Sequence, residues 1–89
     1  MKIPLTIRAT NGAPWETSDF GENDKVDVVR RKATRHFVDG GVMVEGDYLL
    51  ALVANGRATE LADSASLENA GVEEGSILAL LVRGPQVDG

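Results

Sequence analysis

Alternating apolar and polar positions at the start of the chain predict a β-hairpin. Ile3, Leu5 and Ile7 recur with a period of two, which is typical of a strand with one buried face. Asn11-Gly12 follows and is a hairpin signal, because both residue types tolerate a positive φ. Residues 13–20 then form the predicted returning strand, although their middle is polar.

The spacing of apolar residues then changes from two to three and four, which predicts a helix. The apolar stripe of this helix consists of Val26, Val29, Ala33 and Phe37. Asn23 or Asp24 is the predicted N-terminal cap, because either side chain can accept a hydrogen bond from an exposed amide. Residues 39–41 end the helix and provide glycines for the cap.

Two nearly continuous apolar runs, residues 48–54 and 77–82, predict two further strands. Asn55-Gly56 is a second tight turn, and residues 64–71 have the pattern of a single capped turn of helix that ends at glycine. We expect the first and last strands to be neighbours in the middle of one sheet. The predicted fold is an α+β roll, in which a mixed four- to five-stranded sheet packs on one main helix.

Composition and charge limit the functions that this chain can have. A length of 89 residues indicates one domain. The net charge of −5 argues against a nucleic-acid partner, and no apolar run approaches the roughly 20 residues of a membrane helix. The N-terminus has no signal-peptide core, so we expect a cytoplasmic protein. There is no cysteine and only one histidine, His36; we therefore expect no metal, no cofactor and no enzymatic activity.

One face of the predicted helix is basic and consists of Arg30, Arg31, Lys32 and Arg35. We interpret this face as solubilising, with contact to an acidic partner as the alternative. His36 is expected to be solvated or favoured by the negative end of the helix. Trp15 is expected to pack within the hairpin rather than to bind a ligand.

Three stretches of the chain resemble ubiquitin and the wider ubiquitin-like β-grasp superfamily. In LADSASLENAGVEEGSILALLVRG, a loop leucine precedes a leucine-led turn, a small apolar plug, a tight turn and a final strand: Leu61, Leu67, Val72, Glu74-Gly75 and residues 77–82. LVANGR resembles the third strand of the family and its turn. The opening hairpin followed by a single helix is the third similarity. The resemblance implies a β-grasp domain over residues 1–83 and a flexible C-terminal tail over 84–89.

Two features depart from the family pattern. The segment GGVMVEGDY differs from the proline-containing loop of eukaryotic ubiquitin. Conjugated family members end in two glycines, whereas this chain ends in Pro-Gln-Val-Asp-Gly. The overall divergence resembles bacterial ubiquitin-like modifier proteins, some of which are encoded beside activating, conjugating and deubiquitinase-like enzymes.

The resemblance implies a protein modifier that is a substrate of other enzymes. We expect the free protein to be monomeric. In this role an activating enzyme adenylates the Gly89 carboxylate. A conjugating enzyme then attaches the protein to its targets through an isopeptide bond, and a peptidase removes the protein from them. Glycine suits a narrow enzyme cleft because it has no side chain. The residues after Arg83 reach on the order of 20 Å, and Arg83 matches the basic residue of the family that activating enzymes recognise.

A second candidate site is the sheet face opposite the helix. Strand alternation places four residues there: Ala51, Val53, Ala79 and Leu81. The matching face of ubiquitin binds partner proteins, so we expect a partner-binding patch. The alternatives are that loops cover this face or that it is ordinary apolar surface.

Two other functions stay open beside conjugation. One is a β-grasp interaction or adaptor module that is never conjugated. The other is a sulfur carrier, which would form a C-terminal thiocarboxylate. The missing second glycine counts against the modifier, and more heavily against the sulfur carrier.

Overall fold

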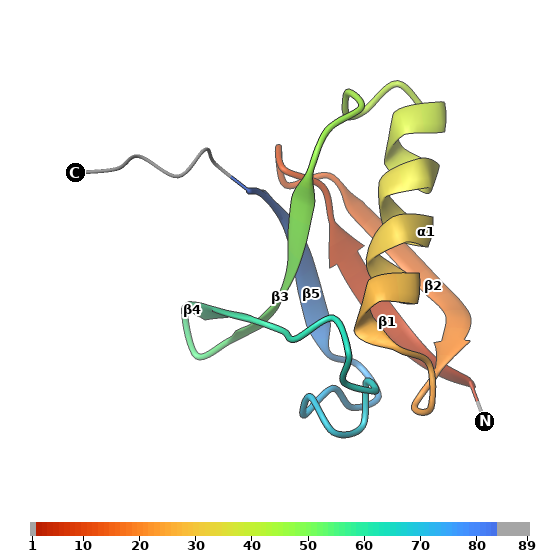
Figure 1. The fold of residues 1–89 in the computed structure, drawn as a ribbon, viewed down its shortest axis with the longest axis vertical. Coiled ribbons are helices and arrows are strands. Elements are labelled where there is room, and N and C mark those ends of the chain that lie inside the picture. Colours follow the sequence, from red (N-terminus) through yellow and green to blue (C-terminus); the bar gives the residue numbers. More distant parts are fainter. Residues whose placement is uncertain (1, 84–89) are drawn as a thin grey trace.

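The computed structural model describes residues 2–83, which form one mixed sheet and one helix (Figure 1). The elements are β1 (Lys2–Arg8), β2 (Pro14–Gly21), α1 (Val26–Asp39), β3 (Tyr48–Ala54), β4 (Arg57–Glu60) and β5 (Ile77–Val82). The strand order is β2-β1-β5-β3-β4, and α1 lies across one face. This architecture confirms the predicted α+β roll. The predicted tail, residues 84–89, lies outside the described residues, so the domain boundary stays a prediction.

The first and last strands pair at the centre of the sheet, as predicted. β1 and β5 are parallel, with Thr6 opposite Ile77 and Arg8 opposite Ala79. The other edge of β5 pairs antiparallel with β3. Side chains from β1, β3, β5 and α1 therefore meet in one core, which includes Leu5, Ile7, Leu50, Leu78 and Leu80.

β4 is an additional edge strand that the pattern of apolar residues in the sequence did not predict. It pairs antiparallel with β3 through the predicted Asn55-Gly56 turn. Both turn residues have positive φ, 54° and 76°, which is the geometry of a two-residue hairpin. All of β4 is exposed, so its residues lack the apolar alternation that marks a half-buried strand.

The opening hairpin forms as predicted, with one difference in its turn. Of Asn11 and Gly12 only the glycine has a positive φ, and the Asn11 side chain accepts a hydrogen bond from the Ala13 amide at 3.0 Å. The β1–β2 register shifts between Ile3 and Leu5, so the ladder has a bulge at this point.

The apolar stripe of α1 is buried along its full length, which confirms the helical spacing: Val26, Val29, Ala33 and Phe37. α1 ends at the predicted glycines. Gly40 is the C-terminal cap, and Gly41 has a φ of 75° that an L side chain rarely adopts. The spacing of the apolar residues therefore determines which side of α1 faces the core, and the two glycines determine where the helix ends.

The predicted N-terminal cap of α1 is wrong. Neither Asn23 nor Asp24 caps the helix; Lys25 occupies the cap position and makes no side-chain cap hydrogen bond. The Asp24 carboxylate instead accepts a hydrogen bond from the Gly21 amide at 2.8 Å. The first two amides of α1 donate to carbonyl groups in the 63–65 loop, which replaces a local cap with a tertiary contact.

The predicted turn at residues 64–71 is a single turn and not a regular helix. The Ala70 amide donates to the Ser66 carbonyl at 2.9 Å, and the Ser66 hydroxyl accepts from the Asn69 amide at 3.1 Å. Leu67 lies in this turn with 0% of its surface exposed. The turn therefore fastens the connection between β4 and β5 to the core.

Replacing Leu67 with alanine is expected to lower the free energy of unfolding by about 3 kcal/mol, because the buried side chain would leave a cavity. Urea denaturation measures this change. Leu81→Ala is the matched control and should cost less than about 1 kcal/mol, because Leu81 is exposed. Equal losses for the two variants would contradict the placement of Leu67 in the core.

Candidate functional site

The candidate site is the sheet face opposite α1. Leu78 and Leu80 point into the core, so the residues that alternate with them on β5 face the other way. The β3–β5 register places Ala51 directly opposite Ala79, and Leu49 opposite Leu81. Val53 lies two residues beyond Ala51 on the same face. The structure therefore brings the four predicted patch residues together on two neighbouring strands.

The four predicted residues differ in how much surface they offer. Leu81 is 39% exposed, and Val53 and Ala79 are half-buried. Ala51 is 0% exposed, so it forms the floor of the face and presents no surface to a partner in this structure. Its cross-strand partners are Ala79 and Glu60. Exposed apolar area thus comes from the residues around Ala51 and not from Ala51 itself.

Two apolar residues extend this surface and were missed in the sequence. Ile77 is the cross-strand partner of Val53, and Leu49 is that of Leu81. Both are half-buried and belong to the same face. The signal was present, since each lies two residues from a predicted patch member. We call Leu49, Val53, Ile77, Ala79 and Leu81 the sheet patch.

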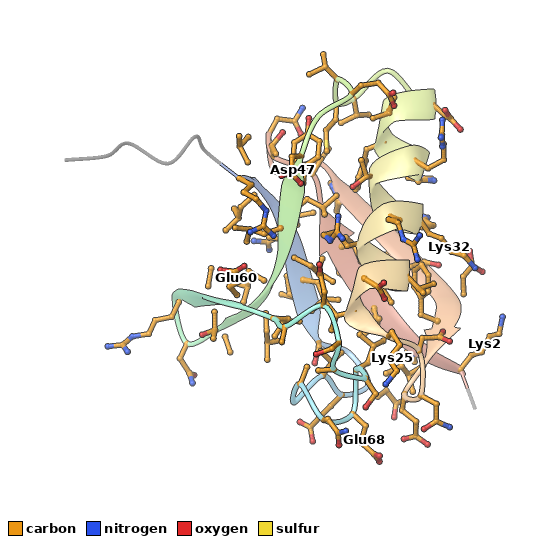
Figure 2. All side chains as sticks on the ribbon, viewed as in Figure 1. Lys2, Lys25, Lys32, Asp47, Glu60 and Glu68 are labelled. Carbon is orange, nitrogen blue, oxygen red and sulfur yellow. The ribbon has the colours of Figure 1, made fainter. Side chains whose placement is uncertain are left out.

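Charged side chains border the sheet patch where β5 ends. The Arg83 guanidinium lies 3.5 Å from an Asp47 carboxylate oxygen and 3.6 Å from one of Glu60. Figure 2 shows Asp47 beside β3 and Glu60 on β4. The Arg83 amide also donates to the Asp47 carbonyl at 3.0 Å. Arg83 therefore lies at the end of β5, as predicted. It forms ion pairs with two carboxylates that the sequence did not predict.

Gly89, the predicted site of adenylation and conjugation, lies outside the described residues. Its predicted role therefore remains a prediction. The described chain ends at Arg83, two residues beyond the exposed Leu81.

An aromatic cluster joins the hairpin to α1 away from the sheet patch. The Trp15 and His36 rings stack with centroids 3.9 Å apart and planes 8° apart. Trp15 also meets Phe20 and Phe37 edge to face. This confirms a packing role for Trp15, although its main partner is the helix and not the hairpin alone. His36 is exposed, but its stacking was not predicted.

Between residues 2 and 83, no group of three or more His, Cys, Asp or Glu side chains could hold a metal ion. In the same range no helix is long and apolar enough to cross a membrane.

Comparison with known proteins agrees with this architecture. No protein-family model and no curated protein sequence matches the chain. A solved structure of Caldiarchaeum subterraneum ubiquitin matches with 25% identity over 98% of this chain and 100% of that chain, at a TM-score of 0.64. A ubiquitin-like protein from Trypanosoma brucei matches with 23% identity over 93% and 96% of the two chains, at 0.67.

The C-terminal ubiquitin-like domain of mouse tubulin-specific chaperone E matches with 24% identity over 99% of this chain and 93% of that chain, at a TM-score of 0.74. The chain therefore has the ubiquitin-like β-grasp fold, which confirms the resemblance and the fold class. The narrower resemblance to bacterial modifiers stays a prediction.

The Arg83–Glu60 ion pair is expected to couple the two side chains by about 0.2–1 kcal/mol, because both are partly exposed. A double-mutant cycle of Arg83→Gln and Glu60→Gln, followed by urea denaturation, measures this coupling. It should shrink as salt is raised. The control cycle pairs Arg83→Gln with Glu68→Gln and should be additive, because Glu68 lies at the other end of the molecule from Asp47, an ion-pair partner of Arg83 (Figure 2). Coupling of equal size in both cycles would contradict the ion pair.

Proposed function

We propose that this ubiquitin-like protein is a protein modifier that acts through the Gly89 carboxylate. The supporting observation is the match with a ubiquitin over nearly the whole of both chains, 98% of this one and 100% of the other. We further propose that it acts in the cytoplasm, in a bacterial ubiquitination-like pathway. Its partners in this proposal are an activating enzyme, a conjugating enzyme, a deconjugating peptidase and target proteins.

The proposed chemistry takes place at the C-terminal carboxylate. One carboxylate oxygen attacks the α-phosphate of ATP, and pyrophosphate leaves. A cysteine thiolate of the activating enzyme then displaces AMP to form a thioester. After transfer to the conjugating enzyme, an amine of the target displaces the thiolate, and an amide bond remains. The protein contributes only the acyl group, so it needs no catalytic residues of its own.

Arg83 is the proposed recognition residue for the activating enzyme. Its side chain is 42% exposed and is shared between Asp47 and Glu60. Exposed ion pairs of this kind contribute about 0–1 kcal/mol. An acidic site on the enzyme could therefore replace the two intramolecular carboxylates at little cost, because the charge of Arg83 would be paired before and after binding.

The sheet patch is the proposed docking surface for these partners. It is apolar at its centre and is bordered by Arg83 on one side and by Arg8, opposite Ala79, on the other. Interfaces combine an apolar centre with a polar rim, and the rim charges orient the partner. Leu81, at 39% exposure, is the proposed main contact because it offers the largest accessible apolar side chain of the patch.

A second candidate function is an interaction module that is never conjugated. The observation in its favour is the match, at a TM-score of 0.74, with a ubiquitin-like domain that is part of a tubulin-specific chaperone. In this alternative the sheet patch carries the function and Gly89 has no chemical role.

The modifier proposal predicts a thioester adduct when the protein is incubated with ATP and its candidate activating and conjugating enzymes. Intact-mass spectrometry should detect the adduct, and a thiol reductant should release it. Deleting Gly89 should abolish the adduct, whereas Gln86→Ala should retain it because the tail keeps its length and its final residue. No adduct, with enzymes that are active on another substrate, would contradict the modifier proposal.

The docking proposal predicts that Leu81→Ala weakens binding of the activating enzyme by about 5–30-fold, because truncation of a central apolar contact costs about 1–2 kcal/mol. Isothermal titration calorimetry measures this change. Val42→Ala is the matched control, since Val42 is an apolar residue of similar exposure, 38%, in the loop that follows α1. An equal loss in the control would show that the sheet patch is not the docking surface.

A further inference from the structure

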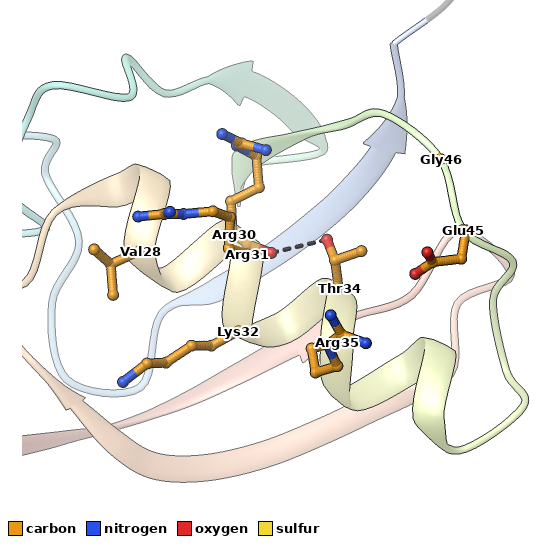
Figure 3. A pocket seen from close by; sticks show the side chains of 8 residues that line it. All are labelled: Val28, Arg30, Arg31, Lys32, Thr34, Arg35, Glu45 and Gly46. Atoms are coloured by element: carbon orange, nitrogen blue, oxygen red, sulfur yellow. Dashed lines mark hydrogen bonds between the residues drawn. The ribbon is translucent and has the colours of Figure 1, made fainter.

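A groove runs between α1 and the loop that precedes β3 (Figure 3). The helix side of its lining includes four cations, which point in different directions from the helix: Arg30, Arg31, Lys32 and Arg35. Glu45 and Gly46 of the loop form the opposite wall. The open space between the walls has a volume of about 620 Å³. We call this feature the basic groove.

The basic groove contrasts with the charge of the whole chain. The chain holds 14 acidic and 9 basic residues, yet four of those nine line this one groove. Glu45 is the single carboxylate residue in the lining. Cations are therefore gathered on one side of an acidic protein, and three of them also have a carboxylate within ion-pair distance: Arg30, Arg31 and Arg35.

The four cations are not equally available to a ligand. Arg30 donates two hydrogen bonds to the Asp63 carboxylate, both at 3.2 Å, and its side chain is only 19% exposed. The backbone carbonyl of Arg30 also accepts a hydrogen bond from the Thr34 hydroxyl at 2.8 Å, which fixes the position of the Thr34 side chain. The Arg30 guanidinium is therefore occupied by Asp63, and its role in the groove is mainly structural.

Arg31, Lys32 and Arg35 are held less firmly than Arg30. Arg31 meets Asp27 at 3.6 Å and Arg35 meets Asp39 at 3.8 Å, and both guanidinium groups are exposed. Within residues 2–83, Lys32 has no carboxylate at ion-pair distance. Exposed pairs one helical turn apart contribute only about 0.3–0.5 kcal/mol. A ligand carboxylate could therefore displace them easily.

We propose that the basic groove binds an acidic segment of a partner protein that carries an apolar side chain among its carboxylates. Arg31 and Arg35 can each take a carboxylate with two parallel hydrogen bonds, and Lys32 adds a third positive charge. Val28 lies among the same lining residues and is partly buried, so it offers an apolar contact beside the alkyl stems of the arginines.

A protein segment fits these observations better than a nucleic acid. Phosphate backbones bind extended basic tracks, whereas Glu45 lies opposite the cations and the whole chain carries −5. A short acidic peptide carries fewer negative charges than a nucleic acid, so the net negative charge of the chain repels it less. The groove is on the outer side of α1, away from the sheet patch, so this interaction is separate from the proposed Gly89 chemistry and does not depend on it.

The probe for this site is a short amidated peptide that alternates glutamate with leucine, titrated into the full-length ¹⁵N-labelled protein at low salt. The largest amide shifts are expected at Val28, Arg31, Lys32, Arg35 and Gly46. The double variant K32Q/R35Q should bind the peptide about tenfold more weakly. The control variant K2Q/R57Q removes the same charge at two exposed sites and should bind like the unmodified protein.

Three results would overturn the proposal. The first is no shift at about 1 mM peptide, a concentration that detects even weak binding. The second is equal loss of binding in K32Q/R35Q and K2Q/R57Q, which would show a response to net charge only. The third is tighter binding of a single-stranded oligonucleotide than of the peptide at the same salt concentration, which would favour a nucleic-acid ligand. Unchanged spectra away from the substituted sites would verify that both variants fold.

Discussion

The parallel pairing of β1 with β5 is the constraint on which the rest of the structure depends. It joins the first and last strands of the described chain at the centre of the sheet, with Thr6 opposite Ile77. A parallel pair needs a crossover, and here β2, α1, β3 and β4 all lie between the two strands in sequence. The core face of β5 must then pack under α1, and its other face must carry the sheet patch, because strand alternation leaves no other arrangement.

This arrangement separates two surfaces that have different chemistry. The open sheet face is apolar at its centre and ends at Arg83, which is paired with Asp47 and Glu60. The outer side of α1 is basic, and three of its cations have only weak or no partners within the described residues. The sheet itself lies between the two, so a partner on one surface leaves the other accessible. A small domain could in this way hold a conjugation partner and an acidic segment at once.

Local patterns predicted most of the fold, and tertiary contacts account for what they missed. The stripe from Val26 to Phe37 is periodic, so its burial followed from spacing alone. The helix start could not be predicted, because the 63–65 loop supplies its acceptors from a distant part of the chain. For the candidate site, alternation placed the patch on the correct face, but the burial of Ala51 and the partners of Arg83 depend on cross-strand register and on loop positions. No local pattern encodes either.

The most direct test of the modifier proposal is mass spectrometry of tryptic peptides from cells that produce the protein. Arg83 is the last basic residue, so trypsin would leave residues 84–89, Gly-Pro-Gln-Val-Asp-Gly, attached to the acceptor amine of each target. The account predicts lysines that carry this remnant, and none in cells that produce a form without Gly89. Abundant free protein with no remnant on any other protein, under conditions in which the candidate enzymes are present, would contradict it and leave an unconjugated interaction module.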